Sequence, residues 1–379
     1  MLSTVLVQIV LALGAASAAA WIYLLIFRGG FWRVREETDP ALAGSTPSVA
    51  AVVPARNEEA VVGRAIESLV KQEYAGPYHV FLVDDHSSDQ TIKTAGVHER
   101  LTVLQAGPMP AGWTGKLWAV SEGLKRAMAL APDYILLTDA DIVHSQATIT
   151  RLLARAQTGN FDLVSWMVKL RCETLAERAL IPAFVLFFFM LYPPSWIASP
   201  RRRTAGAAGG CMLIRRTALE RIGGVEAIRS EVIDDCALAR LVKAHGSIWL
   251  GATHTAQSIR AYDTFSEIAR MISRSAFTQL RHSGLLLAGT LIGMALIYVL
   301  PPLLLFTGDS RAIAFGLTTW ALMTISYLPI LRFYSRSFVW APALPLIAIF
   351  YLGTTLQSAF NYWSGKGGQW KGRIQDARR

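Results

Sequence analysis

The chain has 379 residues, of which 53% are hydrophobic and only 17% are charged. With a mean hydropathy of +0.35, this composition excludes an ordinary soluble protein and indicates membrane segments. Lysine and arginine (37) outnumber aspartate and glutamate (27), so the net charge is +10 and the candidate partners are nucleic acid, an anionic membrane surface and anionic substrates.

Nucleic acid is the least favoured of these partners, because the basic residues are scattered along the flanks of apolar segments without an aromatic and basic stripe. Cys172, Cys211 and Cys236 lie far apart, without a CxxC or zinc-type spacing. They are therefore expected to be reduced thiols.

The first predicted element is an apolar segment from Leu2 to Phe27, which is long enough to cross a bilayer. The small residues Ala15–Ala20 resemble the cleavage site of a signal peptide, but no basic residue precedes the apolar run and the run continues beyond them. We therefore favour an anchor over residues 1–28, followed by a linker over residues 29–47. Three arginines between residues 28 and 35 place the segment after the anchor in the cytoplasm by the positive-inside rule.

Residues 48–284 alternate predicted strands with predicted helices. Short apolar runs predict strands at 48–54, 79–83, 101–104 and 134–138. Helical periodicity appears at 57–71, 90–95 and 116–130. This alternation predicts an α/β domain with a mostly parallel sheet, whose functional loops lie at the carboxyl ends of the strands.

Polar residues follow the first, second and fourth predicted strands. Asn57 can cap the helix that follows the first strand. Asp84 and Asp85 follow the second strand, where they form either a ligand site or a turn with Asx-type hydrogen bonds. Asp139 and Asp141 form an Asp-x-Asp pattern after the fourth strand, and such a pair can face a divalent cation that bridges the oxygens of a diphosphate.

Glycines and charged residues mark three further loops. Lys116 ends a glycine-containing loop and is either a point charge for phosphate or a solvated lysine. Gly209 and Gly210 form a glycine-rich turn before an apolar run. Asp234 and Asp235 open a predicted helix, where a carboxylate either complements the helix dipole or serves as a general base.

The remaining apolar segments concern the membrane. The run 181–192 is too short for a confident span and predicts an interface helix, an apolar wall of a lipid-facing site or a buried core helix. Residues 285–361 contain about three candidate spans, at 285–306, 312–330 and 338–360, followed by a basic tail over residues 362–379. If all three cross, the tail lies outside against the positive-inside rule; otherwise one segment is re-entrant or interfacial.

Taken together, these motifs resemble the family 2 glycosyltransferases, which have the GT-A (nucleotide-diphospho-sugar transferase) fold, over roughly residues 48–280. The matching stretches are VPARNEE at the first strand, DDHSSD at the second, GK at 115–116, TDAD at 138–141, GG at 209–210 and IDD at 233–235. The WTGKLWAV stretch, the TDADI spelling and the arrangement of spans further resemble the hopanoid-associated glycosyltransferases, which are related to ceramide glucosyltransferase.

The resemblance implies an inverting enzyme that moves one sugar from a nucleotide sugar, usually a UDP-sugar, to a lipid hydroxyl, with a hopanoid or sphingolipid-like molecule as acceptor. Asp235 matches the catalytic base, and Asp139 and Asp141 match the residues that hold Mg²⁺ or Mn²⁺. The implied donor-binding residues are Pro54, Arg56, Glu58, Asp84, Asp85, Lys116, Asp139 and Arg274. The implied acceptor-side residues are Gly209, Gly210 and Asp234.

Two positions depart from the family pattern. His86 replaces the glycine that commonly follows the two aspartates. The usual Gln/Arg-x-x-Arg-Trp motif lacks its tryptophan here, so Arg274 is the stand-in for the diphosphate-contacting arginine, with Arg270 one helical turn earlier. The alternative is that both arginines contact lipid headgroups.

The resemblance also implies an integral protein of a bacterial inner membrane with a cytoplasmic catalytic domain and a membrane lipid as partner. One alternative is a polyprenyl-phosphate sugar synthase, whose anionic acceptor needs no base. A second is a processive polysaccharide synthase, for which three C-terminal spans are few. A third is a non-catalytic nucleotide-sugar sensor or scaffold, which has no need to retain the metal-binding carboxylates, the lysine and the base.

Overall fold

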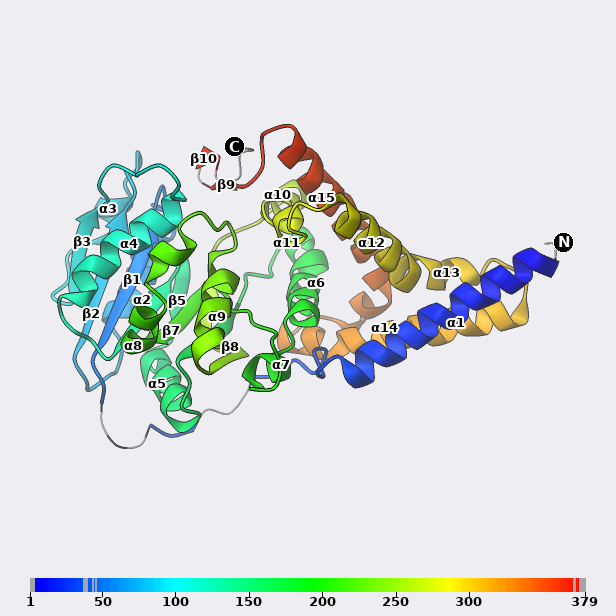
Figure 1. Ribbon diagram of the computed structural model, residues 1–379, viewed down its shortest axis with the longest axis horizontal. Coiled ribbons are helices and arrows are strands. Elements are labelled where there is room, and N and C mark those ends of the chain that lie inside the picture. The colour runs from blue at the N-terminus through cyan, green and yellow to red at the C-terminus, as the bar shows by residue number, and fades with distance from the viewer. Residues whose placement is uncertain (1–3, 37–39, 43, 45, 371–372, 375–379) are drawn as a thin grey trace.

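The computed structural model describes residues 4–36, 40–42, 44, 46–370 and 373–374. The molecule is elongated, with an α/β domain at one end and a bundle of apolar helices at the other (Figure 1). Helix α1 (Thr4–Phe27) begins at the end of the bundle far from the domain, whereas the short strands β9 (Gln369–Trp370) and β10 (Arg373–Ile374) lie back beside the domain (Figure 1).

The domain is built on one eight-stranded sheet with the strand order β3-β2-β1-β4-β7-β6-β8-β5. The strands are β1 (Val49–Ala55), β2 (Tyr78–Asp84), β3 (Leu101–Gln105), β4 (Tyr134–Thr138), β5 (Ile142–His144), β6 (Leu163–Lys169), β7 (Cys211–Arg215) and β8 (Ile248–Ser258). Four strand pairings are parallel and three, two of which involve β7, are antiparallel. The predicted α/β fold with a mostly parallel sheet is confirmed.

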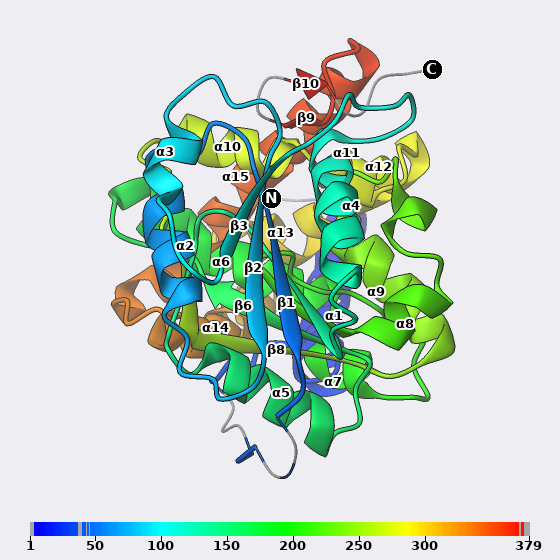
Figure 2. The same cartoon turned by 90° about the vertical axis from the view of Figure 1, so that its left-hand side faces the viewer.

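Helices cover both faces of the sheet, and for this reason all seven residues of the central strand β1 are buried. The helices of the domain are α2 (Val62–Val70), α3 (Thr91–Ala95), α4 (Gly115–Met128), α5 (Thr148–Thr158), α8 (Arg216–Arg221), the 3₁₀ turn η1 (Val225–Ile228) and α9 (Asp234–His245). Figure 2 shows α2 and α4 on opposite sides of β1 and β2. Gly123 lets α4 lie close to the sheet, because a Cβ there would be 2.5 Å from a methyl group of Val52.

The first two strand-end loops differ in detail from the expectation. Helix α2 begins at Val62, so Asn57 does not cap it. Instead, Asn57 has a φ of +51° and its Oδ1 accepts a hydrogen bond from the N–H of Ser88 at 2.8 Å, which ties the first loop to the second. His86 has a φ of +55°, a left-handed conformation that glycine adopts without strain.

Five helical segments in the described part of the chain are long and apolar enough to cross a membrane. The first segment is α1, and the second covers residues 175–198, which contain α6 (Leu175–Leu191) and α7 (Pro194–Ala198). The third covers residues 284–304, which contain α12 (Gly284–Met294), η2 (Ala295–Val299) and α13 (Leu300–Leu304). The fourth is α14 (Ser310–Phe333), and the fifth covers residues 338–363, which contain η3 (Phe338–Ala343) and α15 (Leu344–Trp363). The predicted N-terminal and C-terminal apolar segments are therefore helices of spanning length. The second segment is half buried in the protein and lies between the domain and the bundle (Figure 1).

Helix α1 packs on the segment that contains two consecutive prolines. Pro301 has no N–H to donate to the carbonyl of Ile297, and the indole N–H of Trp21 donates to that carbonyl at 2.7 Å. The hydroxyl of Ser17 donates to the neighbouring carbonyl of Leu296 at 2.7 Å. These two contacts satisfy backbone acceptors in the apolar bundle, where no water is at hand.

The bundle and the domain share one continuous apolar core, which runs from the α4 face of the sheet through α6 to the apolar helices. Residues between α1 and β1 contribute to it, since Phe31 and Val34 are buried. Glu36 accepts hydrogen bonds from the backbone and the ring of His254 on β8. The first part of the segment predicted as a linker is thus packed against the domain.

Candidate active site

A cavity of about 720 Å³ opens at the ends of the sheet strands, between the domain and the helices α6 and α10 (Phe265–Ser273). Its domain side consists of the loops after β1, β4 and β8, the turn before β7 and the start of α9. Its other side includes Phe184 and Phe188 from α6 and Met271 from α10. The cavity therefore has a charged wall facing a partly apolar one.

Most of the predicted site residues line this cavity, although they come from distant parts of the sequence. The lining includes Pro54, Glu58, Lys116, Asp139, Asp141, Gly209, Gly210, Asp234, Asp235 and Arg274. The parallel strands β1, β4 and β8 end at this edge of the sheet, and the antiparallel strand β7 begins there. The remaining residues come from the helices α4, α9 and α10.

Three predicted donor-binding residues are not among the residues that line the cavity in the described part of the chain. Asp84 and Asp85 are each only 1% exposed. Asp84 accepts hydrogen bonds from the N–H of Ser87, as in an Asx-type turn. Arg56 donates to the backbone carbonyl of Asp85 and lies 3.5 Å from its carboxylate. The loop after β2 therefore forms the turn with Asx-type hydrogen bonds. Its contact with a nucleotide-sugar donor stays a prediction.

Lys116 joins two of the acidic groups. Its Nζ lies 3.0 Å from Oδ1 of Asp139 and 3.2 Å from Oδ2 of Asp234. Burial lowers the pKa of Lys116, but the three nearby aspartates outweigh burial and raise that pKa above its ordinary value. The lysine sits in the first turn of α4, which Thr114 caps by accepting from the N–H of Leu117. It is a fixed cation at the charged wall.

Asp235 is held by two backbone donors. Its Oδ2 accepts from the N–H of Gly209 at 2.8 Å, and its Oδ1 accepts from the N–H of Cys236 at 2.7 Å. Burial and the neighbouring charge of Asp234 raise the pKa of Asp235 from 3.8 to about 6. The group is thus mostly ionised at pH 7 and is a better proton acceptor than an ordinary aspartate.

The structure adds a cation that the sequence analysis did not identify, Arg260. Its Nη2 lies 2.6 and 2.8 Å from the two carboxylate oxygens of Glu58, and its Nε lies 3.1 Å from Oδ2 of Asp141. The hydroxyl of Ser258 donates to the same oxygen of Asp141 at 2.9 Å. The sequence offered one signal for Ser258 and Arg260, which is their position at the end of a strand: Ser258 ends β8 and Arg260 follows two residues later.

The two carboxylates of the Asp-x-Asp pattern have suitable chemistry for a hard divalent cation. Both line the cavity, with side chains that are 36% (Asp139) and 10% (Asp141) exposed. Among the residues with described positions, no group of three or more His, Cys, Asp or Glu side chains forms a metal cluster. Two carboxylates fit the way in which Mg²⁺ binds at phosphate sites, where substrate phosphates and water supply the remaining ligands.

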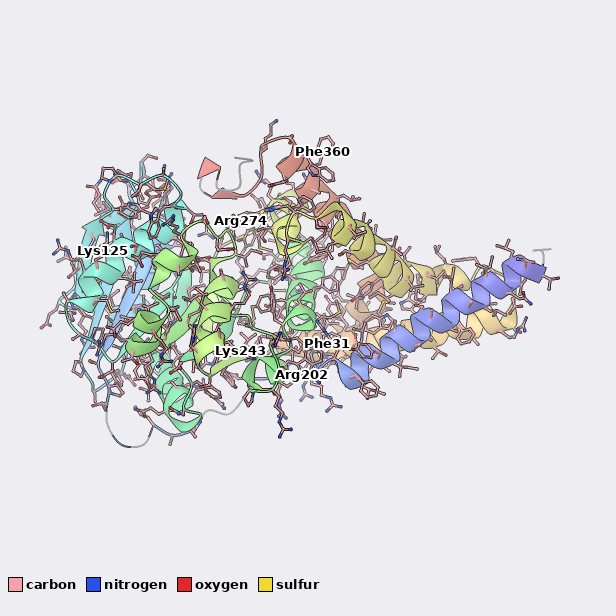
Figure 3. All side chains as sticks on the ribbon, in the orientation of Figure 1. Phe31, Lys125, Arg202, Lys243, Arg274 and Phe360 are labelled. Carbon is pink, nitrogen blue, oxygen red and sulfur yellow. The ribbon has the colours of Figure 1, made fainter. Side chains whose placement is uncertain are left out.

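Helix α10 brings two further cations to the cavity. It begins with a capping box in which Thr264 and Glu267 exchange hydrogen bonds between side chain and backbone. Arg270 and Arg274, one turn apart, both line the cavity. Figure 3 shows Arg274 between the domain and the helices.

Comparison with known proteins places these features in context. A family model described as "Glycosyltransferase like family 2" matches residues 47–276. A beta-monoglucosyldiacylglycerol synthase of Synechocystis is 34% identical over 116 residues, which are 28% of this chain and 23% of that protein. A 4,4'-diaponeurosporenoate glycosyltransferase of Staphylococcus aureus is 30% identical over 95 residues, 25% of this chain and 24% of that protein. The matched stretches thus span about a quarter of these relatives.

Among solved structures, the mannosyltransferase PcManGT of Pyrobaculum calidifontis, in complex with GDP-Man and Mn²⁺, is similar to this chain. The TM-score is 0.58, and the match covers 93% of this chain and 99% of that one. The sequence identity of 16% limits this likeness to the fold.

Proposed function

The chain belongs to the family 2 glycosyltransferases, and from this premise we propose that it transfers one sugar from a nucleotide sugar to a hydroxyl group of a membrane lipid, with inversion at the anomeric carbon. The observation that carries the proposal is the cavity. One wall holds Asp235 beside a cluster of cations and carboxylates, and the opposite wall is partly apolar and continuous with the apolar helices.

The donor is proposed to be a UDP-sugar, with its diphosphate along the charged wall. Lys116 and Arg274 line this space, as do the cations Arg260 and Arg270. Pro54, near the end of β1, and Glu58, after that strand, line it as well. Asp139 and Asp141 would hold Mg²⁺ or Mn²⁺, and a cation held there would supply positive charge against the charge that develops on the diphosphate. Arg56, Asp84 and Asp85 lie at the ends of β1 and β2 and are proposed to shape the nucleoside end of the site.

Asp235 is proposed to be the base that takes the proton from the acceptor hydroxyl as the hydroxyl oxygen attacks the anomeric carbon. The two backbone N–H donors of Gly209 and Cys236 orient its carboxylate, so that little reorganisation is needed at the moment of reaction. Gly209, Gly210 and Asp234 surround the base and are proposed to lie on the acceptor side.

The acceptor is proposed to approach along α6, whose Phe184 and Phe188 line the cavity. Helix α6 is fixed to the bundle, because the carbonyl of Leu180 accepts from the hydroxyl of Tyr351 on α15 at 2.9 Å. The names of the two curated relatives refer to diacylglycerol and diaponeurosporenoate, which are lipid-type molecules. For this chain, a hopanoid or a sphingolipid-like molecule is the proposed acceptor.

Contacts of the last helices support a membrane arrangement in which residues 338–363 are re-entrant. Helix α14 reaches the domain at its end, where Phe333 stacks on His254 with ring centroids 4.1 Å apart. Helix α15 starts beside the middle of α14, since the indole of Trp320 donates to the carbonyl of Pro342 at 2.9 Å. The C-terminal end of α15 returns to the domain side of the bundle (Figure 1).

This arrangement satisfies the positive-inside rule, which three full C-terminal crossings do not. Helix α1, residues 284–304 and α14 would cross the membrane, and both the catalytic domain and the basic tail would lie in the cytoplasm. The inner membrane of a bacterium is the proposed location.

The experiment that tests the proposed activity incubates the detergent-purified protein with a panel of nucleotide sugars, Mn²⁺ or Mg²⁺ and total lipid extract of the host. Mass spectrometry then searches for lipids heavier by one sugar unit, with the Asp235→Asn variant as control. A new glycolipid that the control does not form supports the proposal. A variant with near-normal turnover would favour a polyprenyl-phosphate acceptor, long soluble glycan would favour a polysaccharide synthase, and donor binding without transfer would favour a sensor.

A further inference from the structure

Both carboxylates of the Asp-x-Asp pattern are already paired with cations of the protein itself. Asp139 is paired with Lys116 at 3.0 Å, and Asp141 is paired with Arg260 at 3.1 Å. Arg260 also bonds both carboxylate oxygens of Glu58, so that a single guanidinium holds two acidic side chains from different loops. A metal ion at Asp141 competes with this contact.

The pairing of Asp141 is tight because little water reaches it. The side chains of Asp141, Glu58 and Arg260 are 10%, 9% and 28% exposed. Ser258 supplies a further hydrogen bond to the oxygen that Arg260 contacts. Charge-assisted hydrogen bonds of this kind are among the strong ones in proteins, and removal of one partner leaves the other charge without compensation.

A guanidinium is also well suited to phosphate. Its planar set of N–H donors matches the oxygens of a phosphate as well as those of a carboxylate. Arg260 lines the cavity in which the diphosphate is proposed to bind, so a bound diphosphate offers it new acceptors. The guanidinium can therefore exchange a carboxylate for a phosphate without losing its charge partner.

We propose that Arg260 is an internal counter-ion of Asp141 and Glu58 that makes divalent metal binding depend on the nucleotide diphosphate. Mn²⁺ alone binds weakly, because it must displace the guanidinium from Asp141. In the presence of the diphosphate, Arg260 turns to the phosphate oxygens and Asp141 becomes available to the cation. Metal and nucleotide then strengthen the binding of each other equally, as thermodynamic linkage requires. This inference rests on the proposed donor and metal sites.

The test measures Mn²⁺ binding directly, by the loss of the electron paramagnetic resonance signal of free Mn²⁺ on addition of purified full-length protein. Each protein is titrated without nucleotide, with UDP and with GDP. For Arg260→Gln, we expect Mn²⁺ alone to bind about tenfold more tightly than to the wild type, since one charge-assisted contact no longer competes. We also expect the nucleotide to enhance Mn²⁺ binding less in the variant than in the wild type.

The matched control is Arg270→Gln, which removes the same charge from the same cavity. Within the described part of the chain, Arg270 forms no ion pair with either carboxylate, so this variant measures the general effect of charge on Mn²⁺ affinity. Arg260→Lys keeps the charge but lacks the planar fork, and is expected to fall between the wild type and Arg260→Gln. Thermal unfolding checks that each variant is folded. If Arg260→Gln does not fold, the comparison is made with Arg260→Lys.

The outcomes separate this inference from the proposed function. If the wild type binds Mn²⁺ alone as tightly as Arg260→Gln does, or if Arg270→Gln has the same effect, the role of Arg260 is refuted while the metal site stands. If no protein binds Mn²⁺ even with UDP or GDP, both the metal site and the role of Arg260 are refuted. Weak binding of Mn²⁺ alone to the wild type, strong enhancement by a nucleotide and loss of this coupling only in the Arg260 variants support the inference.

Discussion

Replacement of Asp235 by asparagine is expected to slow sugar transfer strongly and, at pH 7, to stabilise the protein. The pKa of Asp235 is raised from 3.8 to about 6 in the fold. With its pKa raised to about 6, keeping the Asp235 carboxylate ionised at pH 7 costs roughly 3 kcal/mol of stability. Asparagine is neutral and removes this cost.

Part of that gain is lost again. The amide oxygen of asparagine can still accept from the N–H of Gly209, but its NH₂ group then faces the N–H of Cys236, which loses its acceptor. An unsatisfied buried donor costs about 1 to 3 kcal/mol. The net stabilisation at pH 7 is therefore expected to be on the order of 1 kcal/mol, which corresponds to a small rise in melting temperature.

The sign of this effect depends on pH. The cost of the ionised carboxylate is fully present above the folded-state pKa of about 6 and vanishes below the ordinary value of 3.8. The stability advantage of Asp235→Asn should therefore shrink as the pH falls from 7 and reverse before the pH reaches 4. Melting temperatures of the two proteins across this range, measured by tryptophan fluorescence, test the expectation.

Activity provides the second readout. Loss of a general base typically slows a reaction by about 10² to 10⁴-fold. In the wild type, kcat/KM should decrease about tenfold for each pH unit below about 6, because only ionised Asp235 accepts a proton. A variant with turnover within a few-fold of the wild type, or a stability difference that does not change with pH, would refute the reasoning.

Three further predictions follow from single contacts. Asp139→Ala and Asp141→Ala should each abolish metal-dependent release of the nucleoside diphosphate while leaving the melting profile cooperative; wild-type release from both would exclude the metal site. Gly209→Ala places a Cβ 3.3 Å from the carboxylate of the proposed base, and we expect about a tenfold loss of kcat with little loss of stability. Trp21→Phe leaves the carbonyl of Ile297 without its donor and should destabilise the protein by about 1 to 3 kcal/mol, read as a lower melting temperature in detergent; an unchanged value would show that another donor replaces the indole.

The sequence by itself determined the class of fold and the edge of the sheet at which the polar loops gather. Alternating apolar runs and helical periods are local patterns, and β4 has the bounds that its apolar run predicts. The carboxyl ends of parallel strands meet at one edge, so charged residues after β1 and β4 were expected close together. The lengths of the apolar segments were likewise determined by the sequence, because they depend only on how many apolar residues follow one another.

The tertiary structure decided everything that depends on which distant side chains meet. Arg260 contacts Glu58 across 202 residues of sequence, and no local pattern specifies that pairing. The same holds for Asn57, which bonds to the second strand-end loop in place of its own helix. The reason is physical: periodicity reports which face of an element is buried, whereas hydrogen bonds and ion pairs between loops depend on side-chain positions that only the packed chain defines.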